Sequence, residues 1–313
     1  MSARRLLQLV LLVQALAATG IALAAVRWLD AGPWMAAALG LGSVALVRLL
    51  ISMNNFVLAA CFASPTPPAF RLGPWGRLRM LAEEFGASMV MTSWAMPWAR
   101  AGMRVYADSP AVPVLLVHGY GCNSGYWVHL APRLAHARIS HATVDLLPVA
   151  GDIEHYVGQV ERAAEALRVQ TGAARIAVVA HSMGGLVTRA WLRRHGDARL
   201  ARAITLGTPH FGTGLANFGL GVSAAQMRCK GGAPCTWLRE LDAAEDGGRR
   251  ARFTSIFSHH DNIISPQASS LLPGARNLAF GGIGHVALGR NPRILDAVMQ
   301  ELAALRTGDP LPA

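Results

Sequence analysis

Residues 176–185, Ile-Ala-Val-Val-Ala-His-Ser-Met-Gly-Gly, decide the fold of this chain. The uninterrupted apolar run that opens the stretch is typical of a strand buried on both faces of a parallel sheet. The small residues Ala180 and Gly184 flank Ser182, and a helical pattern follows as far as His195. Small neighbours let the backbone turn sharply from strand to helix, so the serine hydroxyl projects above the edge of the sheet. The stretch therefore predicts a nucleophilic Ser182, although Ala180 stands where the consensus for such turns has glycine.

Apolar runs and helical patterns alternate on both sides of this stretch. Short apolar runs predict strands at residues 114–117, 142–146, 175–180, 203–206, 253–257 and 277–280. Longer patterns predict helices at residues 126–138, 152–170, 186–195 and 294–305. Asp152 is expected to cap the second of these helices and Gly172 to end it. Strands and helices that alternate at this spacing predict an α/β fold, with a mostly parallel sheet covered by helices on both faces.

The loop Val-His-Gly-Tyr-Gly at residues 117–121 directly follows the first buried strand. Backbone N–H groups at this position can stabilise the negative charge that develops on a carbonyl oxygen when a serine attacks it. We expect the N–H groups of Tyr120 and Met183 to form this oxyanion hole. His118 is expected to hold the loop in place by packing rather than to take part in the chemistry.

A serine nucleophile also needs a base and an orienting acid, and at such a turn the chain order is serine, acid, histidine. Histidines follow Ser182 at positions 195, 210, 259, 260 and 285. His285 lies in a glycine-rich loop after the last predicted strand, where it can reach over the serine. Among the later acidic residues, only Asp261 follows a strand-like run, whereas residues 242–246 are expected to form a solvated helix. Asp261 and His285 are therefore the predicted acid and base.

These motifs together resemble the bacterial triacylglycerol-lipase branch of the α/β hydrolases. The resemblance covers roughly residues 110–305 and rests on residues 118–121, 180–185, 207–213, 259–266 and 284–288. It implies the α/β-hydrolase fold and cleavage of carboxylic esters, lipid or acylglycerol esters above all, through Ser182, His285 and Asp261. It implies no cofactor, and no carboxylate cluster suited to a metal is found. Residues 211–250 lie where this family inserts a cap or lid. The alternative is that they form a plain connection between a loop and a helix.

Two other functions remain open at this point. Thioesterase, phospholipase or lipid acyltransferase chemistry would use the same machinery. A membrane-bound protein that uses its hydrolase domain only for binding is the other alternative. It is disfavoured because the predicted nucleophile, acid, base and oxyanion loop all occur in the required order.

The N-terminal part of the chain is strongly apolar. Residues 6–26 follow two arginines and are long enough to cross a bilayer as a helix. A second apolar run, residues 34–62, is interrupted by Arg48 and by two asparagines. The first run is either one half of a transmembrane hairpin or a cleaved signal peptide with a small-x-small site at residues 22–24. The hairpin is favoured because the first run is long and the second follows it directly.

The hairpin predicts a multi-pass anchor in a bacterial inner membrane. Arginines flank its two ends while the intervening loop carries only Arg27, so the positive-inside rule puts both ends in the cytoplasm. A cleaved signal peptide would instead place the catalytic domain outside. A disulfide between Cys229 and Cys235, which bracket a turn-rich segment, would suit the outside, and two free thiols are equally expected. The side of the membrane stays open.

Composition and charge agree with a membrane protein. Of the 313 residues, 52% are hydrophobic and 15% are charged, and the mean hydropathy is +0.32. The formal net charge is +11, but the arginines are scattered and no nucleic-acid-binding motif is found. Membrane lipids, rather than nucleic acid, are therefore the expected partners.

The chain is expected to have three parts. They are a membrane anchor at residues 1–63, a linker and amphipathic lead-in at residues 64–110, and the catalytic domain at residues 111–313. A proline-rich break marks the end of the anchor. Trp75, Trp94 and Trp98 in the lead-in would suit a membrane interface, but burial in the core is the favoured prediction.

Overall fold

A seven-stranded sheet forms the centre of the molecule. The computed structural model describes residues 1–305, so residues 306–313 of the predicted catalytic domain lie outside the described part. The strand order is β1-β3-β2-β4-β5-β8-β9. The strands are β1 (Met103–Arg104), β2 (Val114–Val117), β3 (His141–Val144), β4 (Ile176–His181), β5 (Leu200–Leu206), β8 (Phe253–Ser258) and β9 (Arg276–Phe280). All neighbours pair in parallel except β1, which is antiparallel to β3. The predicted α/β fold is confirmed, and each predicted strand overlaps an observed one.

The chain changes the direction in which it adds strands at β2. It places β3 on one side of β2 and β4 on the other. In open α/β sheets, ligands bind outside the carboxyl ends of the strands at such a switch point. The loop at residues 118–121 and Ser182 both leave the sheet at this point.

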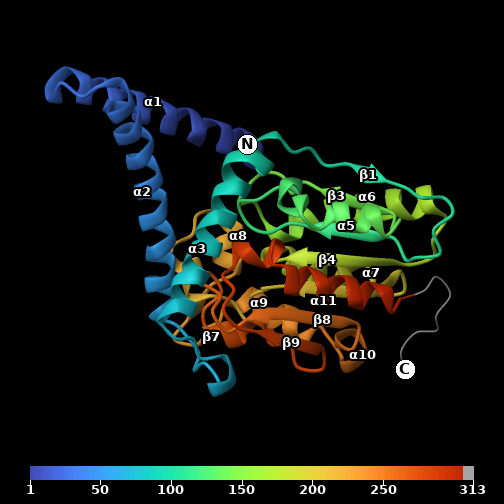
Figure 1. Ribbon diagram of the computed structural model, residues 1–313. Helices are drawn as coiled ribbons and strands as arrows, with labels where there is room; N and C mark the ends of the chain where they lie inside the picture. Colours follow the sequence, from blue (N-terminus) through green and yellow to red (C-terminus); the bar gives the residue numbers. More distant parts are fainter. Residues whose placement is uncertain (306–313) are drawn as a thin grey trace.

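Helices cover both faces of the sheet (Figure 1). The helices α6 (Ile153–Thr171) and α7 (Met183–His195) cover one face, and α5 (Ala131–His136) and α11 (Pro292–Ala303) cover the other. Within β4, Val178 packs into the core on the α6 and α7 face of the sheet, and Val179 packs into the core on the α5 and α11 face. Neither side chain is exposed. The apolar run of β4 therefore reflects burial on both faces.

The ends of two helices follow from local signals. The helix α6 begins after Asp152, whose carboxylate accepts the Glu154 N–H at 2.9 Å, and it ends at Gly172 with a φ of +66°. Both predicted end signals are confirmed. The helix predicted at residues 126–138 is instead split into a 3-10 turn, η3 (Ser124–Val128), and α5. Pro132 lies in the first turn of α5, and proline cannot continue a helix from the preceding turn because it lacks an N–H.

Two long helices, α1 (Ala3–Leu29) and α2 (Pro33–Ala60), form a hairpin that projects from the α/β domain (Figure 1). Small residues line the contact between them. A Cβ atom on Gly40 would overlap with the carbonyl oxygen of Ala18 and touch Ala22. Close approach through small residues is typical of helix pairs in membranes. By length and composition, both helices qualify as membrane spans, a test that a signal sequence near the N-terminus also passes.

The lead-in folds back onto the α/β domain. It forms α3 (Pro74–Val90), a π-helical turn η2 (Met91–Ala95) and the short helix α4 (Met96–Trp98). The buried face of this segment follows the three- and four-residue spacing of one helix face, with Met80, Glu84, Ala87 and Met91.

The three tryptophans of the lead-in lie outside that buried face. Trp75, Trp94 and Trp98 are 82%, 74% and 65% exposed. The prediction that they belong to the core is therefore wrong. The physical reason is that the inward face of α3 and η2 is already filled by the four residues in helical register.

Residues 211–250 form a small cap between β5 and β8. The cap comprises η4 (Gly214–Phe218), α8 (Gly221–Gln226), β6 (Cys229–Lys230), β7 (Ala233–Pro234), α9 (Thr236–Ala243) and α10 (Gly247–Arg250). Cys229 and Cys235 are free thiols, and the Cys235 thiol donates to the Gln226 carbonyl at 3.2 Å. The disulfide that was one alternative is not formed in this structure.

Candidate active site

Ser182 lies on a strained turn between β4 and α7. Its φ is +52° and its ψ is −125°, in a region that non-glycine residues rarely occupy. Its N–H donates to the Leu206 carbonyl at 2.8 Å, and its carbonyl accepts the Thr208 hydroxyl at 2.9 Å. A Cβ on Gly119 would come within 2.8 Å of the Ser182 Cβ, so the loop after β2 packs directly against the turn. Ala180 is buried inside β4, ahead of the strained residue, where a methyl group is tolerated.

Asp261 and His285 form a buried pair. The Nδ1 of His285 lies 2.7 Å from Oδ2 of Asp261. The other carboxylate oxygen accepts the N–H groups of Ile263 at 2.8 Å and Ile264 at 2.7 Å, which fixes the acid in place. Burial on its own lowers the pKa of His285, but the Asp261 carboxylate outweighs it and the pKa is raised.

Gly207 brings this pair beside the serine. It follows β5 directly, and its backbone approaches the pair so closely that a Cβ would meet Asp261 Oδ2 at 2.9 Å and His285 Nδ1 at 3.3 Å. The imidazole rings of His181 and His285 lie 4.6 Å apart between centroids. Within residues 1–305, no hydrogen bond joins Ser182 to His285. The structure thus gathers Ser182, Asp261 and His285 in one buried cluster, 5%, 2% and 5% exposed.

Two backbone N–H groups beside Ser182 are left without an acceptor. Within residues 1–305, neither the N–H of Tyr120 nor that of Met183 donates a hydrogen bond. Met183 is the first residue of α7, and the N–H groups of a first helical turn have no partner inside the helix. Both groups therefore remain available to a ligand oxygen.

His118 holds the loop after β2 in place. Its Nδ1 donates to the Gly119 carbonyl at 2.9 Å, and its Nε2 accepts the Leu146 N–H at 2.9 Å. This pair of bonds uses both ring nitrogens of a neutral imidazole. Burial lowers the pKa of His118, which agrees with that form. These contacts fit the loop-positioning role expected from the sequence.

The comparison with known proteins concerns the same region. A family model for the alpha/beta hydrolase fold matches residues 112–220. The chain therefore has the alpha/beta hydrolase fold. The matched residues run from the strand before the oxyanion loop, through Ser182, to the start of the cap.

Solved α/β hydrolases resemble the chain at low sequence identity. The mature form of a lipase from Bacillus licheniformis has a TM-score of 0.53 and 20% identity, with 65% of this chain and 97% of that chain covered. Lipase B from Aspergillus fumigatus has a TM-score of 0.54 and 19% identity, with 66% of this chain and 57% of that chain covered. Similarity at this level establishes the shared fold.

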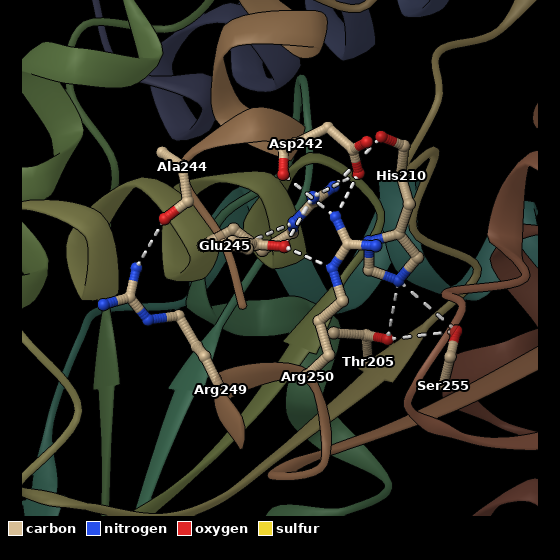
Figure 2. A network of polar contacts seen from close by, with 9 residues as sticks. Thr205, His210, Asp242, Ala244, Glu245, Arg249, Arg250 and Ser255 are labelled. Atoms are coloured by element: carbon tan, nitrogen blue, oxygen red, sulfur yellow. Dashed lines mark hydrogen bonds and ion pairs between the residues drawn. The ribbon is translucent and has the colours of Figure 1, made fainter. Parts of the chain in front are cut away.

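A second buried cluster supports the helix α7, which begins directly after Ser182. The guanidinium of Arg189, on α7, is fully buried and binds both carboxylate oxygens of Glu245, at 2.8 and 2.7 Å. Figure 2 shows the cap residues Asp242, Glu245 and Arg250 gathered beside His210. The expected solvated helix at residues 242–246 is therefore only partly correct: Ala243, Ala244 and Asp246 are exposed, but α9 ends at Ala243 and the Glu245 side chain is buried. Glu245 is buried because it neutralises a buried arginine.

His210 belongs to this cluster and not to the site around Ser182. Its Nε2 lies 3.3 Å from the Thr205 hydroxyl and 3.4 Å from the Ser255 hydroxyl (Figure 2). Burial, followed by the charges of Arg189 and Arg250, holds the pKa of His210 well below its usual range. His210 is thus a neutral structural histidine.

The cap rests on the loop after β2. The Tyr120 hydroxyl donates to the Leu220 carbonyl at 2.7 Å and accepts the Leu220 N–H at 3.2 Å. Phe218, Leu220 and Val222 expose their apolar side chains on this edge of the cap. Tyr120 therefore fastens the cap to the loop after β2 through its side chain.

A cavity of about 570 Å³ lies on the other side of the same loop. The start of α1, residues 145–148, His118 and Cys122 line it. Arg4, Arg5 and Arg100 also line it, and none of the three pairs with a carboxylate of the described chain. The cavity is therefore bordered by three arginines and one carboxylate, that of Asp145.

The sequence did not predict the carboxylate of Glu84, which reaches the His285 loop from α3. It accepts the N–H groups of Val286 at 3.0 Å and Ala287 at 2.9 Å. The only signal available in the sequence was an acidic residue in register with apolar positions on one helix face. That signal does not identify the partner, because the partner lies some 200 residues away along the chain.

Proposed function

We propose that the protein is a membrane-anchored serine hydrolase that cleaves carboxylic esters, with lipid esters as its substrates. The observation that carries the proposal is the buried pair Asp261–His285 beside a strained Ser182 at the carboxyl edge of the sheet. Two solved structures of the same fold are lipases, which supports the ester chemistry.

The proposed reaction has two halves. The Ser182 hydroxyl attacks the ester carbonyl carbon while His285 takes its proton, and Asp261 stabilises the imidazolium that forms. The N–H groups of Tyr120 and Met183 bind the carbonyl oxygen as it becomes negative. The alcohol leaves with the proton from His285, and the acyl group stays on Ser182. Water, deprotonated by His285, then releases the carboxylic acid and restores the serine.

A fluorophosphonate probe tests the nucleophile. The wild-type protein in detergent or nanodiscs should be labelled, Ser182→Ala should not, and the control Ser109→Ala should be labelled like the wild type. An unlabelled wild type, or equal labelling of Ser182→Ala, would contradict the proposal.

The spacing of the exposed tryptophans supports the membrane anchor. Trp28 and Trp34 flank the turn of the hairpin and are exposed. At the other end of α1, the Gln8 side chain donates to the Pro97 carbonyl at 2.9 Å, next to the exposed Trp98. The 20 residues between Gln8 and Trp28 span about 30 Å as a helix. That length matches the hydrocarbon core of a bilayer, and tryptophan is enriched at both of its interfaces.

Contacts at the start of α1 support a retained hairpin over a cleaved signal peptide. The Val149 N–H donates to the Met1 carbonyl at 3.0 Å, and Leu7 packs against the core. Cleavage after residue 24 would remove these contacts. We therefore infer an inner-membrane hairpin with the catalytic domain on the cytoplasmic side, where its flanking arginines are favoured.

Mass spectrometry of the intact protein tests retention, and a reporter fused to the C-terminus tests the side. A mature chain that begins near residue 25, or a reporter active only outside the cytoplasm, would contradict the inference.

Phospholipase activity is the second candidate, and the arginine-lined cavity favours it. Arg4, Arg5 and Arg100 border a space that also contains Asp145, and an anionic headgroup would offset the excess positive charge. Phosphatidylglycerol and diacylglycerol with the same acyl chains separate the two candidates. Phospholipase activity predicts a higher kcat/KM for phosphatidylglycerol, and Arg100→Gln should reduce only that value. Equal kcat/KM values for the two lipids would contradict phospholipase activity and leave hydrolysis of neutral esters as the proposed function.

A further inference from the structure

A buried carboxylate from outside the sheet faces the loop of the candidate base. Glu84 lies on α3 and is 2% exposed. Its Oε1 accepts the N–H of Val286 at 3.0 Å, and its Oε2 accepts the N–H of Ala287 at 2.9 Å. These are the first two residues of the turn η6 (Val286–Gly289), and His285 immediately precedes them. Glu84 therefore fixes the backbone directly after the imidazole.

The loop is built to let this carboxylate approach. A Cβ on Gly284 would lie 2.5 Å from Glu84 Oε2 and 2.6 Å from its Cδ. Only glycine therefore fits at position 284 with Glu84 in place. From the opposite side, Asn262 Oδ1 accepts the His285 N–H at 2.8 Å. Three successive backbone N–H groups, those of residues 285–287, are thus held by two side chains from distant parts of the sequence.

Glu84 is also electrostatically coupled to His285. Burial raises the pKa of Glu84, while the two N–H donors and the imidazole of His285 oppose that rise. In return, the Glu84 charge adds to that of Asp261 in raising the pKa of His285. Within residues 1–305, no arginine or lysine forms an ion pair with Glu84. A buried carboxylate without a cationic partner is energetically unfavourable. A protonated His285 imidazole would supply the missing positive charge.

Other ionisable groups face the same space from each element packed around it. They are Asp261 after β8, His181 at the end of β4, Tyr126 on η3 and Arg290 after η6. His181 stacks on Tyr126 at 4.0 Å between ring centroids, and burial first of all holds its pKa well below the usual range. Burial likewise raises the pKa of Tyr126. Glu84 and Asp261 are therefore the two groups that bring negative charge to His285.

We propose that Glu84 is a positioning residue for His285, which holds the histidine loop and supplies a second negative charge to the imidazolium formed during attack by Ser182. This inference rests on the proposed serine-hydrolase function. It also makes α3, a helix outside the predicted catalytic domain, part of the catalytic machinery.

The test measures the rate of fluorophosphonate labelling and of short-chain ester hydrolysis from pH 5 to 9, in the full-length protein in nanodiscs. The variants are Glu84→Gln, which removes the charge, and Glu84→Asp, which keeps it on a shorter side chain. The control is Glu83→Gln, which removes a charge from the adjacent, partly exposed residue that pairs with Arg79. Thermal unfolding of each variant establishes that it is folded.

The direction of the pH effect follows from the role of His285 as a base. The rate rises as His285 loses its proton, so the acidic limb of the profile tracks its pKa. Removing the Glu84 charge lowers that pKa, and the limb of Glu84→Gln should move to lower pH. Its plateau should fall about 10- to 100-fold in kcat with little change in KM, as expected when one charge-assisted acceptor is lost. Glu84→Asp should keep the limb in place and lose part of the plateau.

The outcomes separate this inference from the proposed function. If the wild type is not labelled, the serine-hydrolase function is wrong, and the proposed role of Glu84 is then wrong as well. If the wild type is labelled and Glu84→Gln matches Glu83→Gln at every pH, the hydrolase stands and the inference is wrong. A slower Glu84→Gln whose acidic limb does not move would make Glu84 merely structural, which also overturns it. If Glu84→Gln does not fold, a displaced limb in Glu84→Asp overturns it, and an unmoved limb with a lower kcat supports it.

Discussion

At the scale of single residues, the candidate site depends on one strained backbone and on glycines that make room for it. The positive φ of Ser182 costs about 1–3 kcal/mol. The surrounding contacts stabilise this conformation, including the bond from its N–H to Leu206 at 2.8 Å. Gly119 and Gly207 let the oxyanion loop and the Asp261–His285 pair approach without side chains of their own. These contacts therefore keep Ser182 in its strained conformation before any substrate binds.

Asp261→Asn tests the pair at this scale. The substitution keeps the shape but removes the charge that raises the pKa of His285. We expect kcat to fall by about 10⁴-fold, and the acidic limb of the residual activity to move to lower pH. A pH–rate profile of ester hydrolysis measures both. Asp246→Asn in the cap is the control, and similar activity of the two variants would remove Asp261 from the proposed mechanism.

At the scale of elements, the helix α7, which follows Ser182, is held by charge as well as by apolar packing. Arg189 is buried on it, and the cap supplies Glu245 as its counter-charge. The cap therefore stabilises the helix that begins at Ser182, besides covering the oxyanion loop through Tyr120.

Glu245→Gln should destabilise the protein by about 1–3 kcal/mol, because it removes the bidentate partner of the buried Arg189 and leaves it only Asp242, at 3.4 Å, as a counter-charge. Chemical unfolding in detergent measures this. The control Glu240→Gln removes a charge from an exposed position of α9 and should change the stability by less than about 0.5 kcal/mol. Equal stabilities would mean that the ion pair contributes nothing to holding α7.

Tyr120→Phe removes the hydroxyl that fastens the cap and keeps the N–H proposed for the oxyanion hole. The loss of two hydrogen bonds to Leu220 should cost about 1 kcal/mol. Amide exchange of residues 218–226 should then become several-fold faster. Tyr106→Phe, on the far edge of the sheet, is the control. Unchanged exchange in Tyr120→Phe would show that the cap is held by other contacts.

At the scale of the whole molecule, each N-terminal helix contacts a different loop at the carboxyl edge of the sheet. The Met1 carbonyl of the α1 end accepts the Val149 N–H at 3.0 Å, and Ser265 donates to the Ala59 carbonyl of α2 at 2.7 Å. Glu84 of α3 holds the loop of His285. The division into an anchor, a lead-in and a catalytic domain stays a prediction, and these contacts couple all three parts at the candidate site.

Gly40→Leu tests this coupling. A side chain at position 40 would overlap with the backbone of α1, whereas Gly42 has open space around it. Gly40→Leu should therefore lower the stability by about 1–3 kcal/mol, and Gly42→Leu should not. Thermal unfolding in nanodiscs measures the difference. If the two variants unfold at the same temperature, close packing of the hairpin does not stabilise the molecule.

The sequence by itself determined the α/β fold, the ends of α6 and the turn at Ser182. These features depend on apolar periodicity, on glycine and on capping residues, all of which act within a few residues along the chain. Chain order also singled out Asp261 and His285, which the structure joins at 2.7 Å. The expected break before the catalytic domain came from composition alone and carried no information about contacts.

Only the tertiary structure decided which buried charges meet. Glu84 faces the loop of His285 from about 200 residues away, and Glu245 neutralises Arg189 across the cap. The sequence analysis expected Glu245 in a solvated stretch and did not identify Glu84, because burial of a charge depends on a partner that local pattern does not reveal. The exposure of Trp75, Trp94 and Trp98 was likewise decided by which face of α3 and η2 the α/β domain covers. The periodicity of the sequence indicates that a helix has an apolar face. Long-range packing decides which of the remaining residues of that helix are exposed to solvent.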